Sequence, residues 1–147
     1  MVAEGATAPD FEAQSDEGRT VKLSDLRGNP VVLYFYPKDD TPGCTTQACG
    51  IRDAWGEFET AGIQVLGVSR DGIDDHKAFK EKFGLQFPLL ADDDQSIARE
   101  YGVDPISEEF PGYKRTTVLI DADGNVVRRL ENDDPSTQAD DVLSALS

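Results

Sequence analysis

The chain has 147 residues, 38% of them hydrophobic, a size and composition suited to one globular domain spanning residues 1–147. Its formal net charge is −15, with 29 acidic and 14 basic residues, so nucleic acid and anionic membranes are poor partners. With no run of about 18 apolar residues and no basic or apolar signal segment at residues 1–5, the sequence excludes a membrane span and predicts a cytoplasmic protein.

The first part of the chain predicts a hairpin, a short helical turn and a buried strand. Residues 11–13 and 20–23 flank a turn-forming segment, which favours an N-terminal hairpin. Ser24 can cap a single helical turn that ends at Gly28. Residues 31–36 form a continuous apolar run, typical of a central strand that is covered on both faces.

Helices and strands alternate over the rest of the chain. A helix is expected over residues 45–61, before Gly62, and a second buried strand over 63–69. A helix capped by Asp74 is expected over 74–83. The remaining elements are expected to be a strand at 87–91, a helix at 94–101, a hairpin of 116–120 and 126–130, and a helix at 136–146. This order predicts an α/β domain with a mixed sheet, in a thioredoxin-like arrangement.

The numbers of cysteines and histidines limit the chemistry. The chain has two cysteines, and in a reducing compartment such a pair is more often redox-active or catalytic than structural. A metal site would need more ligands, and the single histidine, His76, cannot supply a histidine-rich one. We therefore expect no metal and no other cofactor.

The most informative segment connects the first buried strand to the helix that follows it. A loop between two prolines leads to Cys44, in the first turn of that helix, where unpaired N–H groups and the helix dipole stabilise the reactive thiolate. The Thr41 hydroxyl can donate to the sulfur or to an oxygen beside it. Pro42 stiffens the loop, and Gly43 lets a substrate come close to the backbone. From position alone, a reactive Cys44 and a small buried hydrophobe are about equally good interpretations.

The residues around Cys44 also resemble those of a known family. Pro37-x-x-x-Thr41-x-x-Cys44 matches the active-site pattern of peroxiredoxins, and the string from Phe35 to Thr45 resembles the bacterioferritin comigratory protein branch, also called peroxiredoxin Q. The similarity runs from residues 5–11 to residues 115–121. It implies a thioredoxin-like (peroxiredoxin) fold, with a central mixed sheet flanked by helices and an N-terminal hairpin.

The resemblance also implies roles for individual residues. Cys44 would be the peroxidatic cysteine and Cys49 the resolving cysteine, which closes an intramolecular disulfide with it. Arg115, expected at the start of a strand, would be an ordinary surface arginine without the resemblance. With it, the residues expected to bind the peroxide are Pro37, Thr41, Gly43 and Arg115.

The implied function is reduction of hydrogen peroxide and organic hydroperoxides through a Cys44 sulfenic acid. A thioredoxin or a similar dithiol would then reduce the disulfide, and a monomer is expected. One alternative is a thioredoxin-like disulfide oxidoreductase, although those enzymes usually carry Cys-x-x-Cys and the spacing here is Cys-x₄-Cys. Another is a non-catalytic thioredoxin-fold binding module whose cysteines are incidental.

Four other features are expected to have structural roles. The segment from Asp121 to Asn125 is interpreted as a turn rather than a calcium loop, because its glycine comes too early and later ligands are missing. We expect the acidic run 92–94 to be a solvated helix start and His76 to be exposed. Trp55 and Phe58 are expected to pack the cysteine-bearing helix onto the sheet.

The spacing of the two cysteines predicts a conformational change. Five residues along one helix separate the Cα atoms by about 8.6 Å, from a rise of about 7.5 Å and a rotation of about 140°. A disulfide tolerates at most about 7 Å. We therefore expect residues 41–51 to unwind before Cys44 and Cys49 can bond.

The acidic residues are distributed along the chain, as in proteins of salt-loving organisms. Because dissolved salt screens repulsion between like charges, we expect the stability of the fold to rise with salt concentration.

Overall fold

A computed structural model describes residues 4–92, 94–106, 112–131 and 138–146. These residues form a two-stranded hairpin and a five-stranded sheet in the order β5-β4-β3-β6-β7. Strands β3, β4 and β5 are parallel, β6 is antiparallel to β3, and β7 is antiparallel to β6, so the sheet is mixed as predicted. The strands of this sheet are β3 (Val31–Phe35), β4 (Gln64–Ser69), β5 (Leu89–Ala91), β6 (Thr116–Ile120) and β7 (Val126–Glu131).

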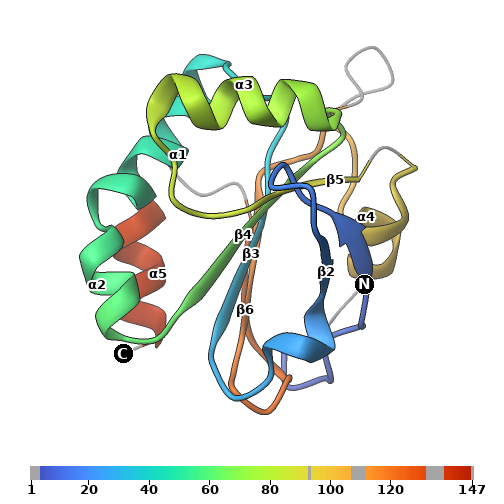
Figure 1. Cartoon of the computed structure of the whole chain (residues 1–147). Coiled ribbons are helices and arrows are strands. Elements are labelled where there is room, and N and C mark those ends of the chain that lie inside the picture. Colours follow the sequence, from blue (N-terminus) through green and yellow to red (C-terminus); the bar gives the residue numbers. More distant parts are fainter. Residues whose placement is uncertain (1–3, 93, 107–111, 132–137, 147) are drawn as a thin grey trace.

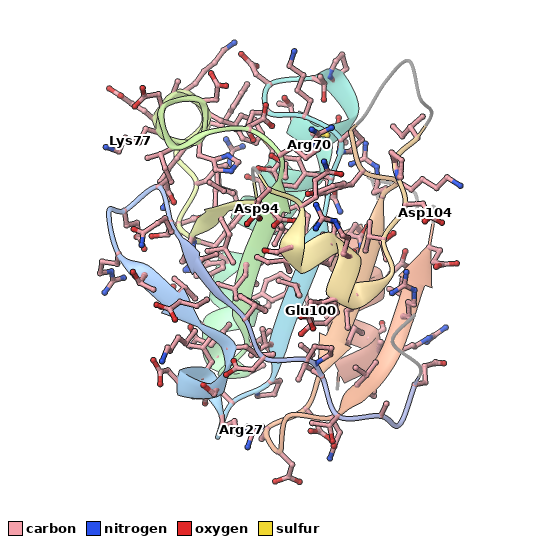
Figure 2. All side chains as sticks on the ribbon, turned by 90° about the vertical axis from the view of Figure 1, so that its right-hand side faces the viewer. Arg27, Arg70, Lys77, Asp94, Glu100 and Asp104 are labelled. Atoms are coloured by element: carbon pink, nitrogen blue, oxygen red, sulfur yellow. The ribbon has the colours of Figure 1, made fainter. Side chains whose placement is uncertain are left out.

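Both faces of the sheet are covered (Figure 1). One face carries α1 (Pro42–Asp53), α2 (Trp55–Thr60), α3 (Ile73–Phe83) and α5 (Gln138–Leu146). The other face carries β1 (Glu12–Gln14), β2 (Thr20–Lys22), the 3₁₀ turn η1 (Leu23–Leu26) and α4 (Ser96–Tyr101). Figure 2 looks onto this second face, where α4 and the N-terminal segment lie across the sheet. The arrangement confirms the thioredoxin-like fold with its N-terminal hairpin.

The sequence of β3 explains how the two sides of the domain are built. All five of its residues are buried, because β3 is the middle strand and both of its faces are covered. Side chains alternate along a strand, so Val32 and Tyr34 face the α1 side, and Val31, Leu33 and Phe35 face the α4 side. The central strand therefore connects two apolar cores and carries the chain to the start of α1.

The predicted helix over 45–61 is wrong in two respects. It begins three residues earlier, with Pro42 at the first helical position, where proline's missing N–H is not needed. It is also interrupted at Ala54, which separates α1 from α2. Nothing in the sequence indicates this break, since alanine is the best helix former. Trp55 and Phe58 lie on α2 and pack against the same apolar cluster as α1, as expected.

Two other helix starts differ from prediction. Helix α3 begins at Ile73, with Gly72 rather than Asp74 as its N-cap. Helix α4 begins at Ser96, and Asp92 is not solvated but 1% exposed, accepting hydrogen bonds from the N–H groups of Ile97 and Ala98. A buried carboxylate at this helix start satisfies donors that water would otherwise serve. Asp93 and the predicted start of the last helix at 136–137 lie outside the described residues.

The ends of two helices are as predicted, with Gly84 and Gly102 in the left-handed conformation that glycine adopts without strain.

The segment at Asp121 is a turn, in which the Asp121 carboxylate accepts hydrogen bonds from the N–H groups of Asp123 and Asn125. Among the described residues, no helix is both long and apolar enough to span a membrane.

Candidate active site

The peptide chain between β3 and α1 places Cys44 near the carboxyl end of the central strands. Thr41 is the N-cap of α1, Pro42 follows it, and Cys44 is the third residue of the helix, in the first turn as predicted. Cys44 is 2% exposed and Cys49 is partly buried; both are free thiols. The thiol of Cys44 thus lies at the positive end of the α1 dipole, which stabilises a thiolate.

Arg115 lies directly beside this thiol. It precedes β6, whose first residue, Thr116, pairs with Phe35 at the end of β3, so the sheet register brings Arg115 to Cys44. Its Nη1 and Nη2 atoms are 3.8 and 3.7 Å from Cys44 Sγ. A guanidinium at this distance favours the charged form of the sulfur and can also bind a polar oxygen placed next to it.

Gly43 makes this close approach possible. A Cβ atom at residue 43 would lie 2.9 Å from Arg115 Nη2, closer than a side chain can normally come. The sequence predicted that Gly43 lets a substrate come close to the backbone, whereas the group that lies against it in the structure is the guanidinium of Arg115. Any residue with a Cβ atom at this position would therefore displace the guanidinium.

Thr41 is arranged differently from the prediction. Its hydroxyl donates to the carbonyl oxygen of Lys38 at 2.8 Å, so its single proton is not directed at the sulfur of Cys44. The oxygen keeps its lone pairs and can accept a hydrogen bond from a bound molecule. The Thr41 side chain accepts no hydrogen bond from the N–H groups of the first turn of α1, so it does not cap the helix. Pro37 lies half-buried just beyond the end of β3.

Two glutamines that were not predicted as site residues hold Arg115 in place. Gln47 Oε1 accepts a hydrogen bond from Arg115 Nη1 at 2.6 Å, and Gln47 Nε2 donates to Gln138 Oε1 at 3.0 Å. Gln138 Nε2 in turn donates to the Thr117 hydroxyl at 2.8 Å. Both glutamines are at most 1% exposed. Gln47 could have been found, because it lies three residues after Cys44 on the same helix face, but nothing in the sequence indicates Gln138.

His76 is fully buried, and the prediction that it is exposed is wrong. Because α3 begins at Ile73, His76 and Phe79 share the inward face of the helix, while the adjacent Lys77 is exposed (Figure 2). His76 Nδ1 is 2.6 Å from Asp39 Oδ2, and Nε2 is 2.9 Å from the carbonyl oxygen of Leu90. The Tyr36 hydroxyl donates to the other carboxylate oxygen of Asp39 at 2.5 Å.

This environment shifts the pKa values of both partners upward. Burial raises the pKa of the Asp39 carboxyl, and the hydrogen bonds and charge of His76 and the Tyr36 hydroxyl offset only part of that effect. Burial alone would lower the pKa of His76, but the hydrogen bond and charge of Asp39, together with the Leu90 carbonyl, outweigh it, so the pKa of His76 is raised. Among the described residues, no group of three or more His, Cys, Asp or Glu side chains is arranged to hold a metal ion.

The sequence and the fold of this chain are similar to those of known proteins. The model of the AhpC/TSA family matches residues 5–129. The sequence is 45% identical to peroxiredoxin Bcp of Bacillus subtilis over 128 residues, which cover 84% of this chain and 82% of that protein. The structure resembles peroxidoxin BcpB of Mycobacterium tuberculosis with a TM-score of 0.92 at 34% identity, over 99% of this chain and 97% of that one. A bacterioferritin comigratory protein of Xanthomonas campestris, studied for its alkyl peroxide reduction activity, has a TM-score of 0.87 at 35% identity, over 92% and 89% of the two chains.

Proposed function

This chain belongs to the AhpC/TSA family, in the branch of Bcp and peroxiredoxin Q proteins, and we propose that it is a thiol peroxidase that reduces hydrogen peroxide and organic hydroperoxides. The observation that carries the proposal is the contact between the Arg115 guanidinium and the Cys44 sulfur at the start of α1. A cation and a helix N-terminus converge on one thiol there, which is what a reactive cysteine requires.

The first step is attack of the Cys44 thiolate on the terminal oxygen of the peroxide. An S–O bond forms, the O–O bond breaks, and the departing oxygen takes up a proton to leave as water or an alcohol. Cys44 is left as a sulfenic acid. Arg115 and the N–H groups of the first turn stabilise the negative charge on the oxygens, and the Thr41 hydroxyl oxygen accepts a hydrogen bond from the peroxide.

The second step joins the two cysteines. The Cys49 thiol attacks the sulfenic acid, the S–S bond forms, and the sulfenic oxygen leaves as water. Both cysteines lie in α1, where regular helix geometry separates their Cα atoms by about 8.6 Å, more than the roughly 7 Å a disulfide tolerates. The start of α1 must therefore unwind, and because Gln47 lies between the cysteines, unwinding breaks its contacts with Arg115 and Gln138.

The third step returns the enzyme to its reduced form. A dithiol such as thioredoxin attacks the Cys44–Cys49 disulfide, which breaks through a mixed disulfide. The reductant leaves as a disulfide, and Cys44 and Cys49 are again thiols. Since both cysteines are in one helix of one chain, the cycle needs no second subunit, which supports a monomer.

A peroxide-consumption assay with dithiothreitol tests the proposal against its alternatives. The reduced wild-type protein should consume many equivalents of peroxide, and Cys44→Ser none above background. Cys49→Ser should be oxidised once and then stall or depend on an external thiol. A disulfide oxidoreductase or a binding module would not consume peroxide catalytically, and that result would overturn the proposal.

A further inference from the structure

A buried polar cluster lies behind the active-site loop and takes no part in the steps above. It consists of Tyr36, Asp39, Ser69, Asp71 and His76, which we call the His76 cluster. Tyr36 directly follows β3, Ser69 is the last residue of the parallel strand β4, and His76 also contacts the carbonyl of Leu90 in β5. Asp39 is in the loop that leads to Thr41. The cluster therefore connects that loop to the ends of three neighbouring strands and to α3.

The partners of His76 fix the number of protons in the cluster. A carbonyl oxygen can only accept, so His76 Nε2 must carry the proton in its 2.9 Å contact with Leu90. The 2.6 Å contact between Nδ1 and Asp39 also needs a proton, which belongs either to an imidazolium or to a carboxylic acid. Asp39 and His76 thus share one proton, and the raised pKa values of both groups fit its retention.

Asp39 anchors the loop from its backbone as well as from its side chain. Its N–H donates to Asp71 Oδ2 at 2.8 Å, and the same carboxylate oxygen accepts a hydrogen bond from Ser69 at 2.6 Å. The next residue, Asp40, has a φ of 59°, a left-handed conformation that non-glycine residues rarely adopt. Such a conformation persists where its surroundings hold it, and here it lies between the anchored Asp39 and Thr41, the N-cap of α1.

We propose that Asp39 and His76 are positioning residues for peroxide attack: their shared proton fixes the loop so that the Thr41 oxygen and the first turn of α1 face the substrate. The inference rests on the proposed peroxidase function and extends it to residues that touch neither the peroxide nor Cys44. Its physical basis is that a misplacement of about 1 Å at a reacting centre can slow a reaction about a hundredfold.

Loss of the shared proton should release the loop. Without it, the Asp39 carboxylate faces a lone pair of His76 across 2.6 Å, and attraction becomes repulsion. Because both pKa values are raised, the stabilisation is present at lower pH and is lost as pH rises through the pKa values of the folded state. The other groups facing the pair do not compensate, since the Asp71 carboxylate adds negative charge and burial keeps the Tyr36 phenol protonated.

Asp39→Asn distinguishes the effect of the shared proton from the effect of side-chain packing. Its amide can donate to Nδ1 of a neutral His76 and accept from Tyr36, so the contacts remain but there is no acidic proton to lose. His76→Phe removes the partner altogether and leaves the carboxylate of Asp39 buried. Asp75→Asn, a change at an exposed carboxylate next to His76, is the matched control for charge.

The test is the second-order rate constant of Cys44 oxidation by hydrogen peroxide across neutral and alkaline pH, measured in the Cys49→Ser background. The rate constants of the wild type and of Asp75→Asn should be lower at alkaline pH than at neutral pH. The rate constant of Asp39→Asn should not decrease between neutral and alkaline pH. His76→Phe should be slower by about ten- to a hundredfold at all pH values. If the wild type reacts with peroxide but all four profiles have the same shape and height, the positioning role is wrong. If the wild type does not react, the proposed function itself fails.

A measurement on the unmutated protein covers the case in which a variant does not fold. His76 is the only histidine in the chain, so its ring nitrogens can be assigned without ambiguity in an NMR titration. The proposal predicts that the Nδ1 proton is retained well above the ordinary pKa of histidine. Titration at or below that ordinary pKa would overturn it, whatever the variants do.

Discussion

Arg115 Nη2 lies 3.7 Å from the Sγ atom of Cys44, although 71 residues separate the two in the chain. The antiparallel register of β3 and β6 produces this contact, because it places the start of β6 beside the end of β3. Arg115 is therefore the cation that stabilises both the thiolate and the oxygens of the substrate in the proposed mechanism.

Replacing Arg115 by alanine should slow peroxide attack by about a hundredfold or more, the usual effect of removing one donor to a developing negative charge. The thiolate fraction of Cys44 at neutral pH should also fall, which ultraviolet absorbance of the thiolate can follow. Arg115→Lys keeps the charge and loses the planar fork, so it should recover the thiolate more than the rate. If Arg115→Ala changes neither quantity, Arg115 is an ordinary surface residue.

Gly43→Ala tests the close packing of Arg115 directly. The added methyl group would lie 2.9 Å from Nη2 and should displace the guanidinium, slowing peroxide attack about tenfold or more. The fold should not be weakened, since alanine favours a helix over glycine by about 1 kcal/mol. Gly50→Ala is the control, because nothing lies within 4 Å of its Cβ position. It should leave peroxide attack unchanged and, by stabilising α1, slow disulfide formation. Equal peroxide rates for the wild type and Gly43→Ala would contradict the packing argument.

Gln138→Leu should change the balance between folded and unwound α1. It leaves the Nε2 group of Gln47 without its buried acceptor, at a cost of about 1–3 kcal/mol to the folded arrangement. Disulfide formation after peroxide treatment should then be about fivefold faster or more. In hydrogen exchange, the hydrogen-bonded amides within residues 41–51, which begin at Thr45, should be protected in the reduced wild type, less protected in Gln138→Leu, and unprotected in the oxidised form.

Gln64→Ala, at an exposed glutamine, is the control for this change and should behave as the wild type. Equal protection of these amides before and after oxidation would show that α1 does not unwind, and the resolving thiol would then have to come from another chain.

The acidic surface makes a prediction about solution conditions. With a formal net charge of −15, self-repulsion opposes the compact state, so the melting temperature should rise from low to molar salt. A melting temperature that is flat or falls over this range would contradict an adaptation to high salt.

The sequence was sufficient to predict what depends on local patterns. The apolar run of β3 indicated a central strand, and Cys44 after Pro42 and Gly43 indicated the first turn of a helix. Arg115 was found because the resemblance pointed to it, and the strand start at residue 116 was consistent with that position.

The errors about burial concern residues whose environment comes from distant parts of the chain. His76 and Asp92 looked solvated because their neighbours in sequence are charged, yet each is buried by elements far away and bonded to them. Gln138 reaches Gln47 across 91 residues, a contact that no local pattern encodes. Polar groups inside a domain follow tertiary packing, whereas periodicity and capping report only on neighbours in sequence.

The most direct test of the central claim is mass spectrometry of the reduced protein after one equivalent of hydrogen peroxide. The account predicts that the wild type loses two hydrogens as a single Cys44–Cys49 disulfide within one chain. Cys49→Ser should instead gain one oxygen as a Cys44 sulfenic acid that a dimedone reagent traps, and Cys44→Ser should not change. An unmodified wild type, or oxidation of Cys49 at the wild-type rate in Cys44→Ser, would contradict the assignment of Cys44 as the residue that attacks the peroxide.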